Sequence, residues 1–178
     1  GALSTAQLAA LTTDQLPKMT TAQVASLTTA QLASLSVADL NAFTAGQYAA
    51  LSSTQIAGLT TTQVAGLTTE DAAALTSTAI KGLTTAQMAA LETADVAALD
   101  TADLAAISTA AIKAMSTAQI DALGTAQLSK LTTAQVASLT TTQLAALSTG
   151  DLNTIKTKQF AAFASTQVTG FTTAQIAV

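Results

Sequence analysis

The chain has 178 residues, contains neither cysteine nor histidine, and carries six lysines against ten carboxylates, for a net charge of −4. This composition excludes disulfides, zinc sites built from thiolates or imidazoles, and Ser-His catalytic triads. It argues against nucleic acid as a partner, because no basic surface could neutralise phosphates, and against a membrane span, because Thr and Gln interrupt every apolar run long before about 18 residues.

The sequence is an array of octapeptides. Residues 1–2 are interpreted as a leader or a processed remnant, and the 176 residues after them divide into 22 consecutive octapeptides without an insertion. Residues 131–138, LTTAQVAS, serve as the reference copy, with Leu131 at position 1 and Ser138 at position 8. A short fixed period predicts stacked units, so we expect residues 3–178 to form one solenoid domain.

Each octapeptide carries two signals for the start of a helix. Thr132 and Gln135 have the spacing of a capping box, in which the Thr hydroxyl accepts from the N3 amide and the Gln side chain accepts from the cap amide. Leu131 and Val136 have the spacing of a hydrophobic staple. Because the next cap follows after eight residues and needs non-helical backbone angles, each helix must end almost at once. Helices this short fold only by packing on their neighbours.

The period excludes one continuous helix, because eight residues sweep about 800° and no amphipathic face survives. A β-solenoid remains as an alternative, although positions 1 and 6 would point to opposite faces of a strand and Ala and Gln are poor strand formers. We therefore predict an all-α solenoid of short capped helices, one per octapeptide. Asp39, Asp71 and Asp103 recur at intervals of 32 residues, which favours four octapeptides per superhelical coil over three.

Along the chain, positions 1 and 6 are apolar in every copy and form the expected core. Pro17, at position 7 of the second copy, lacks an amide hydrogen, a loss that short helices are expected to tolerate. Position 5 is Gln in 15 copies and Ala in two, Ala79 and Ala111. In five copies it is an Asp that suits the helix dipole but is not expected to close the capping box as Gln does: Asp39, Asp71, Asp95, Asp103 and Asp151. Three copies with poor caps should be weak corners: Glu92, Lys156 and Ala164.

Acidic side chains are the groups that most suggest chemistry. Glu70 and Asp71 are adjacent, and four more acids lie within twelve residues of one another: Glu92, Asp95, Asp100 and Asp103. Their places in the repeat explain them as caps or first-turn residues, and none matches an EF-hand loop. We therefore predict no catalytic, cofactor-binding or metal-binding residue, no cofactor, and no enzymatic activity.

Three other features have structural interpretations. Adjacent threonines at positions 2 and 3 could form an ice-like face, but position 2 is needed as a cap and neighbouring residues on a helix diverge by about 100°. Lys81 and Lys113 are expected to be solvated. Tyr48 is expected in the core with its hydroxyl at the rim.

The string L-T-T-A-Q-[LIV]-A-[AS] resembles the octapeptide arrays of very large secreted bacterial surface proteins, often labelled adhesion or haem-utilisation proteins. The resemblance covers all 22 copies and implies an extracellular or cell-surface location. The haem label gains no support, because no His or Cys is present to ligate the iron. Residues 131–139 also resemble the first helix of transcription-activator-like effector repeats, but the period and the low charge exclude that reading.

We therefore expect a non-enzymatic structural repeat segment, serving as a spacer, stalk, adhesive or filament-forming part of a secreted or cell-surface bacterial protein. Its first and last copies are ordinary repeats without polar capping units, so the expected partners are neighbouring repeats of the same chain or end-to-end copies of it. The alternative is an ice-binding or other surface-binding module that uses a Thr-rich face.

Overall fold

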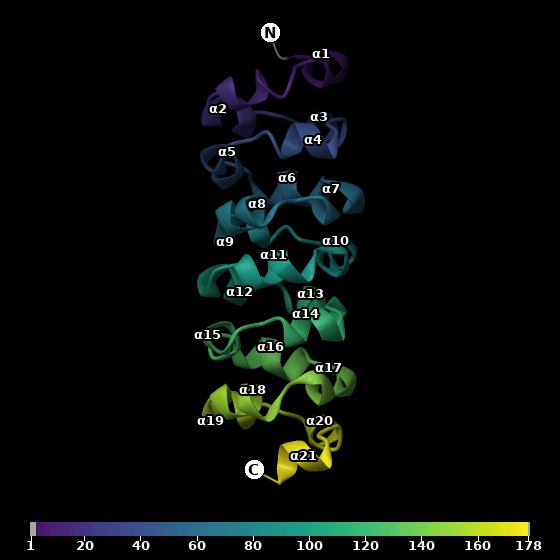
Figure 1. The fold of residues 1–178 in the computed structure, drawn as a ribbon, viewed down its shortest axis with the longest axis vertical. Coiled ribbons are helices and arrows are strands. Elements are labelled where there is room, and N and C mark those ends of the chain that lie inside the picture. Colours follow the sequence, from purple (N-terminus) through teal and green to yellow (C-terminus); the bar gives the residue numbers. More distant parts are fainter. Residues whose placement is uncertain (1–2, 178) are drawn as a thin grey trace.

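The computed structural model describes residues 3–177 as a column of short helices with the two chain ends at opposite poles (Figure 1). The described residues contain 21 α-helices, one 3-10 helix and no strand. The α-helices are α1 (Thr5–Ala9), α2 (Thr21–Ala25), α3 (Thr29–Ala33), α4 (Val37–Leu40), α5 (Ala45–Ala49), α6 (Ser53–Ala57), α7 (Thr61–Ala65), α8 (Thr69–Ala74), α9 (Ser77–Ile80), α10 (Thr85–Ala90), α11 (Thr93–Ala98), α12 (Thr101–Ala106), α13 (Thr109–Ala114), α14 (Thr117–Asp121), α15 (Thr125–Leu128), α16 (Thr133–Ser138), α17 (Thr141–Ala146), α18 (Thr149–Thr154), α19 (Thr157–Phe160), α20 (Ser165–Val168) and α21 (Thr173–Ile176). The predicted all-α solenoid is confirmed.

Each octapeptide forms one capped element, as α16 illustrates. Its cap, Thr132, has extended backbone angles (φ −71°, ψ 157°). The Gln135 amide donates to the Thr132 hydroxyl over 3.2 Å, and the Thr132 amide donates to Gln135 Oε1 over 2.8 Å. The helix ends at Leu139, which is extended again. The predicted corner between one helix and the next therefore lies at positions 1 and 2 of the repeat.

The second octapeptide departs from the pattern. In place of an α-helix it has a 3-10 turn, η1 (Leu16–Lys18), with Pro17 in its first turn. Proline has no amide hydrogen to donate to the carbonyl four residues earlier, so the α-helical ladder cannot form there. The expectation that a short helix would tolerate Pro17 was wrong, although the Thr12 amide still donates to Gln15 Oε1 over 2.9 Å.

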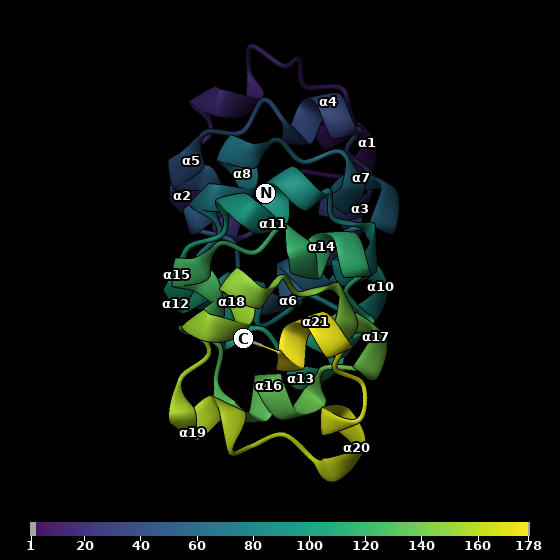
Figure 2. The ribbon, with the colours of Figure 1, turned by 60° about the horizontal axis from the view of Figure 1, so that its bottom comes forward.

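Successive coils stack with a fixed offset. Helix α10 contacts α7 of the preceding coil and α13 of the following coil, three octapeptides away in each direction. The coil below a residue is the preceding, N-terminal coil, which Figure 1 draws nearer the top. Side-chain hydrogen bonds between coils join residues 28 and 31 positions apart, as from Gln135 to Ile107 and Leu104. One coil therefore holds between three and four octapeptides, which refines the predicted number of four. The offset arises because each Gln lies above the corner between two helices and not above a helix. Figure 2, with the lower pole turned forward, shows the coils one behind another.

The core is the aliphatic interior of the column. Positions 1 and 6 are buried from Leu8 and Leu16 onward through Leu147, as predicted, with partial exposure at Leu11 and Met19. Near the poles the same positions are exposed, reaching 48% at Phe160 and 66% at Ile176. Within residues 3–177, every helix is too short and too polar to cross a bilayer.

Candidate functional site

The glutamines at position 5 are the polar groups that organise the column. Gln135 is 1% exposed, and its Nε2 donates to the carbonyl oxygens of Leu104 and Ile107, each over 2.8 Å. Its Oε1 accepts from the Thr132 amide. One side chain thus caps its own helix and binds two carbonyls of the coil below. The same pattern is made by Gln47, Gln55, Gln63, Gln87, Gln119, Gln127, Gln143, Gln159, Gln167 and Gln175.

Sequence reasoning identified the capping half of this role and missed the other half. A capping box needs only the Oε1 atom of Gln, which leaves the amide donor unexplained. A buried amide donor requires an acceptor, so the preference for Gln over Glu at position 5 was the signal that could have revealed the contact between coils.

Asp at position 5 closes the capping box in three copies, contrary to the prediction. Asp39, Asp71 and Asp151 accept from their cap amides over 2.9, 3.2 and 3.0 Å. The carboxylate reaches the cap amide because the two groups are already close in the first turn. An ionised Asp has no hydrogen to donate, so it cannot bind the carbonyls below.

Asp95 shows the consequence of that missing donor. The residue is 2% exposed, and its Oδ2 has no hydrogen-bond partner. By the register of the neighbouring glutamines, this oxygen lies above the corner that holds the carbonyls of Val64 and Leu67. Burial is the main cause that raises the pKa of Asp95, and the nearby charge of Glu92 raises it further.

Two further buried carboxyls, Asp71 and Asp103, also have raised pKa values. Burial raises the pKa of Asp71, and the adjacent charge of Glu70 adds to the increase while the Thr68 bonds oppose it. Burial and the charge of Asp100 raise the pKa of Asp103 to about 6. Asp71, Asp95 and Asp103 all stand at position 5 in the middle of the column, and only Asp95 and Asp103 belong to consecutive octapeptides.

The acidic residues noted in the sequence occupy cap and first-turn positions of the helices. Asp100 caps α12, accepting from the amides of Ala102 and Asp103 over 2.7 and 2.8 Å. Residues 3–177 contain no group of three or more acidic side chains arranged to hold a metal ion. Glu92, Lys156 and Ala164 make no side-chain cap bond, and that their three corners are weak stays a prediction. Gly124 also makes none.

The threonines at positions 2 and 3 have separate structural roles. Position-2 hydroxyls act as caps throughout most of the column, as at Thr20 and Thr140. Thr29, at position 3, packs closely against the following coil, because a Cβ added to Gly58 of that coil would overlap the Thr29 side chain.

Tyr48 is fully buried and its hydroxyl has no hydrogen-bond partner, so the expectation of a hydroxyl at the rim was wrong.

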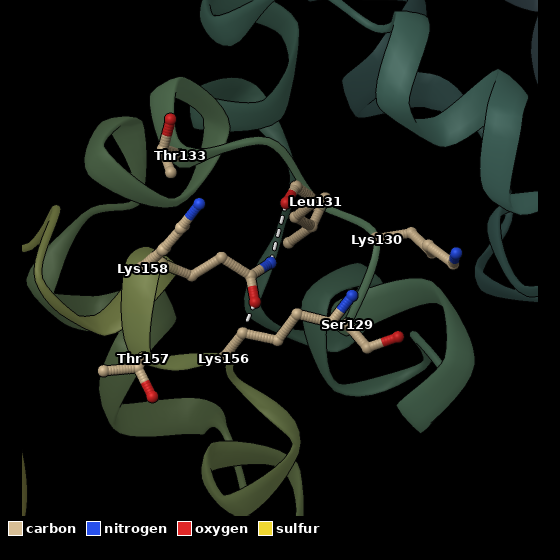
Figure 3. Close-up of a pocket in the computed structure, with 8 residues that line it drawn as sticks. Ser129, Lys130, Leu131, Thr133, Lys156, Thr157 and Lys158 are labelled. Carbon is tan, nitrogen blue, oxygen red and sulfur yellow. Dashed lines mark hydrogen bonds between the residues drawn. The ribbon is translucent and has the colours of Figure 1, made fainter.

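A surface groove of about 440 Å³ lies between the copies at residues 123–138 and α19. Three of the six lysines of the chain line it, and its lining includes no carboxylate. We name it the lysine groove: Ser129, Lys130, Leu131, Thr133, Lys156, Thr157, Lys158 and Gln159. Lys156 and Lys158, from the cap of α19 and from α19 itself, extend toward Ser129 and Thr133 of the facing coil, and the side chain of Lys130 points away from both (Figure 3). Such a groove can attract anions. Sequence reasoning missed it, because the stacking offset that joins its two sides was unknown.

Comparison with protein families gives one match that extends over the whole chain. The ALTTAQ repeat matches six segments: residues 1–37, 32–69, 69–101, 96–133, 121–149 and 144–178. The matched segments follow the octapeptide array described above. Comparison with curated proteins gives no match.

Proposed function

The chain belongs to the ALTTAQ repeat family, and from this premise we propose that it is a non-enzymatic spacer segment of a secreted or cell-surface bacterial protein. As a structural repeat, it holds whatever lies at its two poles at a fixed separation. The observation that carries this proposal is the position of the chain ends at opposite poles of one column of stacked coils (Figure 1).

The hydrogen bonds between coils support a spacer role. Gln31 binds the Leu3 carbonyl near one pole, and Gln175 binds the carbonyls of Leu144 and Leu147 near the other. A solenoid is held together by contacts between adjacent units, so its length is set by the number of repeats. A spacer uses that property, because adding repeats changes its reach without changing its local structure.

The chemistry of the described residues supports a non-enzymatic role. The carboxyls with raised pKa values are buried, and none of them lines the lysine groove. Catalytic groups need access to a substrate. The resemblance to octapeptide arrays of secreted bacterial surface proteins supports the proposed location.

Small-angle X-ray scattering tests the spacer proposal. We compare the chain with a variant in which residues 115–146, four octapeptides, are duplicated in tandem. The maximum dimension should increase by about 8 to 10 Å, the thickness of one helix layer. An unchanged maximum dimension, or a compact sphere, would contradict the proposal. Labelling of intact bacteria with an antibody against the segment tests the location, and signal only after permeabilisation would reject a surface role.

A further inference from the structure

The lysine groove combines residues that are distant in sequence. Gln159 Nε2 donates to the carbonyls of Leu128 and Leu131 over 3.1 and 2.7 Å, which seats α19 above that corner of the coil below. Lys158 and Lys130 are 28 residues apart, the same offset that the glutamine bonds define elsewhere. Their presence in the lining of one groove is therefore a product of the fold.

The lysines occupy positions where the repeat normally has other residues. Lys156 stands at position 2, where Ser or Thr would cap the helix, and α19 has no side-chain cap bond. Lys158 stands at position 4, where most copies have Ala or Thr. A sequence that departs from its local rules without a structural gain marks a candidate functional site.

The charge of the chain is divided unevenly. Residues 1–121 hold nine of the ten carboxylates and three lysines, and residues 122–178 hold one carboxylate and three lysines. The first part thus has a net charge of −6 and the second a net charge of +2, which sum to −4. An anionic polymer is repelled by most of the column and attracted only near the lysine groove.

We propose that the lysine groove binds the phosphate or sulfate ester groups of an anionic polymer. Lysine ammonium groups bind such groups as mobile point charges. The hydroxyls of Ser129, Thr133 and Thr157 lie in the same lining and can donate to ester oxygens. The inference adds a ligand to the proposed surface role but rests on different observations, so the rod can be confirmed while this site fails.

Isothermal titration calorimetry with three polymers tests the site: polyphosphate, dextran sulfate and neutral dextran. The chain should bind at least one of the two anionic polymers and not the neutral one. Preference between polyphosphate and dextran sulfate identifies whether the groove favours phosphate or sulfate groups. Binding should weaken as salt is raised, because the lysines are exposed.

A matched pair of variants separates the groove from overall charge. Lys130→Gln/Lys156→Thr/Lys158→Gln removes the groove lysines, and Lys18→Gln/Lys81→Gln/Lys113→Gln removes the other three with the same change in net charge. The groove variant should bind about tenfold more weakly or not at all, and the control about as well as the parent chain. Circular dichroism verifies that both fold. Equal weakening in the two variants, binding of neutral dextran, or no binding by the parent chain would overturn the proposal.

Discussion

Two adjoining segments of the column differ in how they are joined to the coil below. In the glutamine-linked segment, residues 115–146, all four position-5 residues are Gln, and each binds two carbonyls of the preceding coil. In the central segment, residues 67–114, only Gln87 does so, and the other five position-5 residues are Asp or Ala: Asp71, Ala79, Asp95, Asp103 and Ala111. Both segments have the same fold and the same buried columns.

The difference separates two functions of one side chain. Closing a capping box needs only an acceptor, so Asp71 can replace Gln in the cap. Binding the coil below needs a donor, so no ionised Asp and no Ala can replace Gln there. The helices are thus encoded within each octapeptide, whereas the coupling between coils depends on one amide group per repeat.

Removing a linking glutamine should have the largest effect. Gln135→Ala deletes two bonds to the coil below and one cap bond at a buried site, and it leaves carbonyls without their donor. We expect a loss of about 3 kcal/mol in the free energy of unfolding. Urea titration followed by far-UV circular dichroism measures it.

Gln23→Ala is the matched control, because Gln23 is exposed and accepts only from the Thr20 amide. Its expected loss is about 1 kcal/mol or less, the value of one cap bond. Equal losses for the two variants would show that the bonds between coils contribute nothing.

Supplying the missing donor should stabilise the central segment. Asp95→Gln replaces a buried carboxylate that has an unpartnered oxygen with an amide that can reach the carbonyls of Val64 and Leu67. We expect a gain of about 2 kcal/mol at pH 7, because a charge without a full set of partners leaves the interior and hydrogen bonds form. Asp151→Gln, at a more exposed site, should change stability less. A destabilised Asp95→Gln variant contradicts the account.

Acidification should stabilise the column. Asp71, Asp95 and Asp103 have folded-state pKa values raised above 3.8, to about 6 for Asp103. Protonation therefore favours the folded chain: their contribution to stability is fully present below about pH 4 and is lost as the pH rises through the raised values. The melting temperature should increase from pH 7 to pH 4. An Asp71→Asn/Asp95→Asn/Asp103→Asn variant should show a much flatter dependence.

Restoring a missing cap should give the smallest effect. Ala164→Thr supplies the hydroxyl that α20 lacks, beside a Gln167 that already links to the coil below. The expected gain is about 1 kcal/mol. Thr140→Ala, which removes an existing cap, should give a loss of similar size. No change in either variant would mean that the caps do not limit stability in a column already joined by glutamines.

The local structure was predictable and the assembly was not. Thr132, Gln135 and the apolar columns gave the helix starts, the corners and the core, because these depend on residues within eight positions of one another. The stacking offset depends on contacts 28 and 31 residues apart, so the second role of Gln135 and the lysine groove, which residues of two coils line, were missed. Pro17 and Tyr48 were misjudged because the effect of each depends on its own surroundings.

Hydrogen exchange of the glutamine side-chain amides, measured by NMR, tests the central claim most directly. Both hydrogens of the amide groups of Gln119, Gln127, Gln135 and Gln143 are engaged with carbonyls of the coil below. Their exchange with water should be strongly slowed, and that of Gln23, which is exposed, should match a free side chain. Equally fast exchange at all five residues would contradict the claim that glutamine amides join the coils.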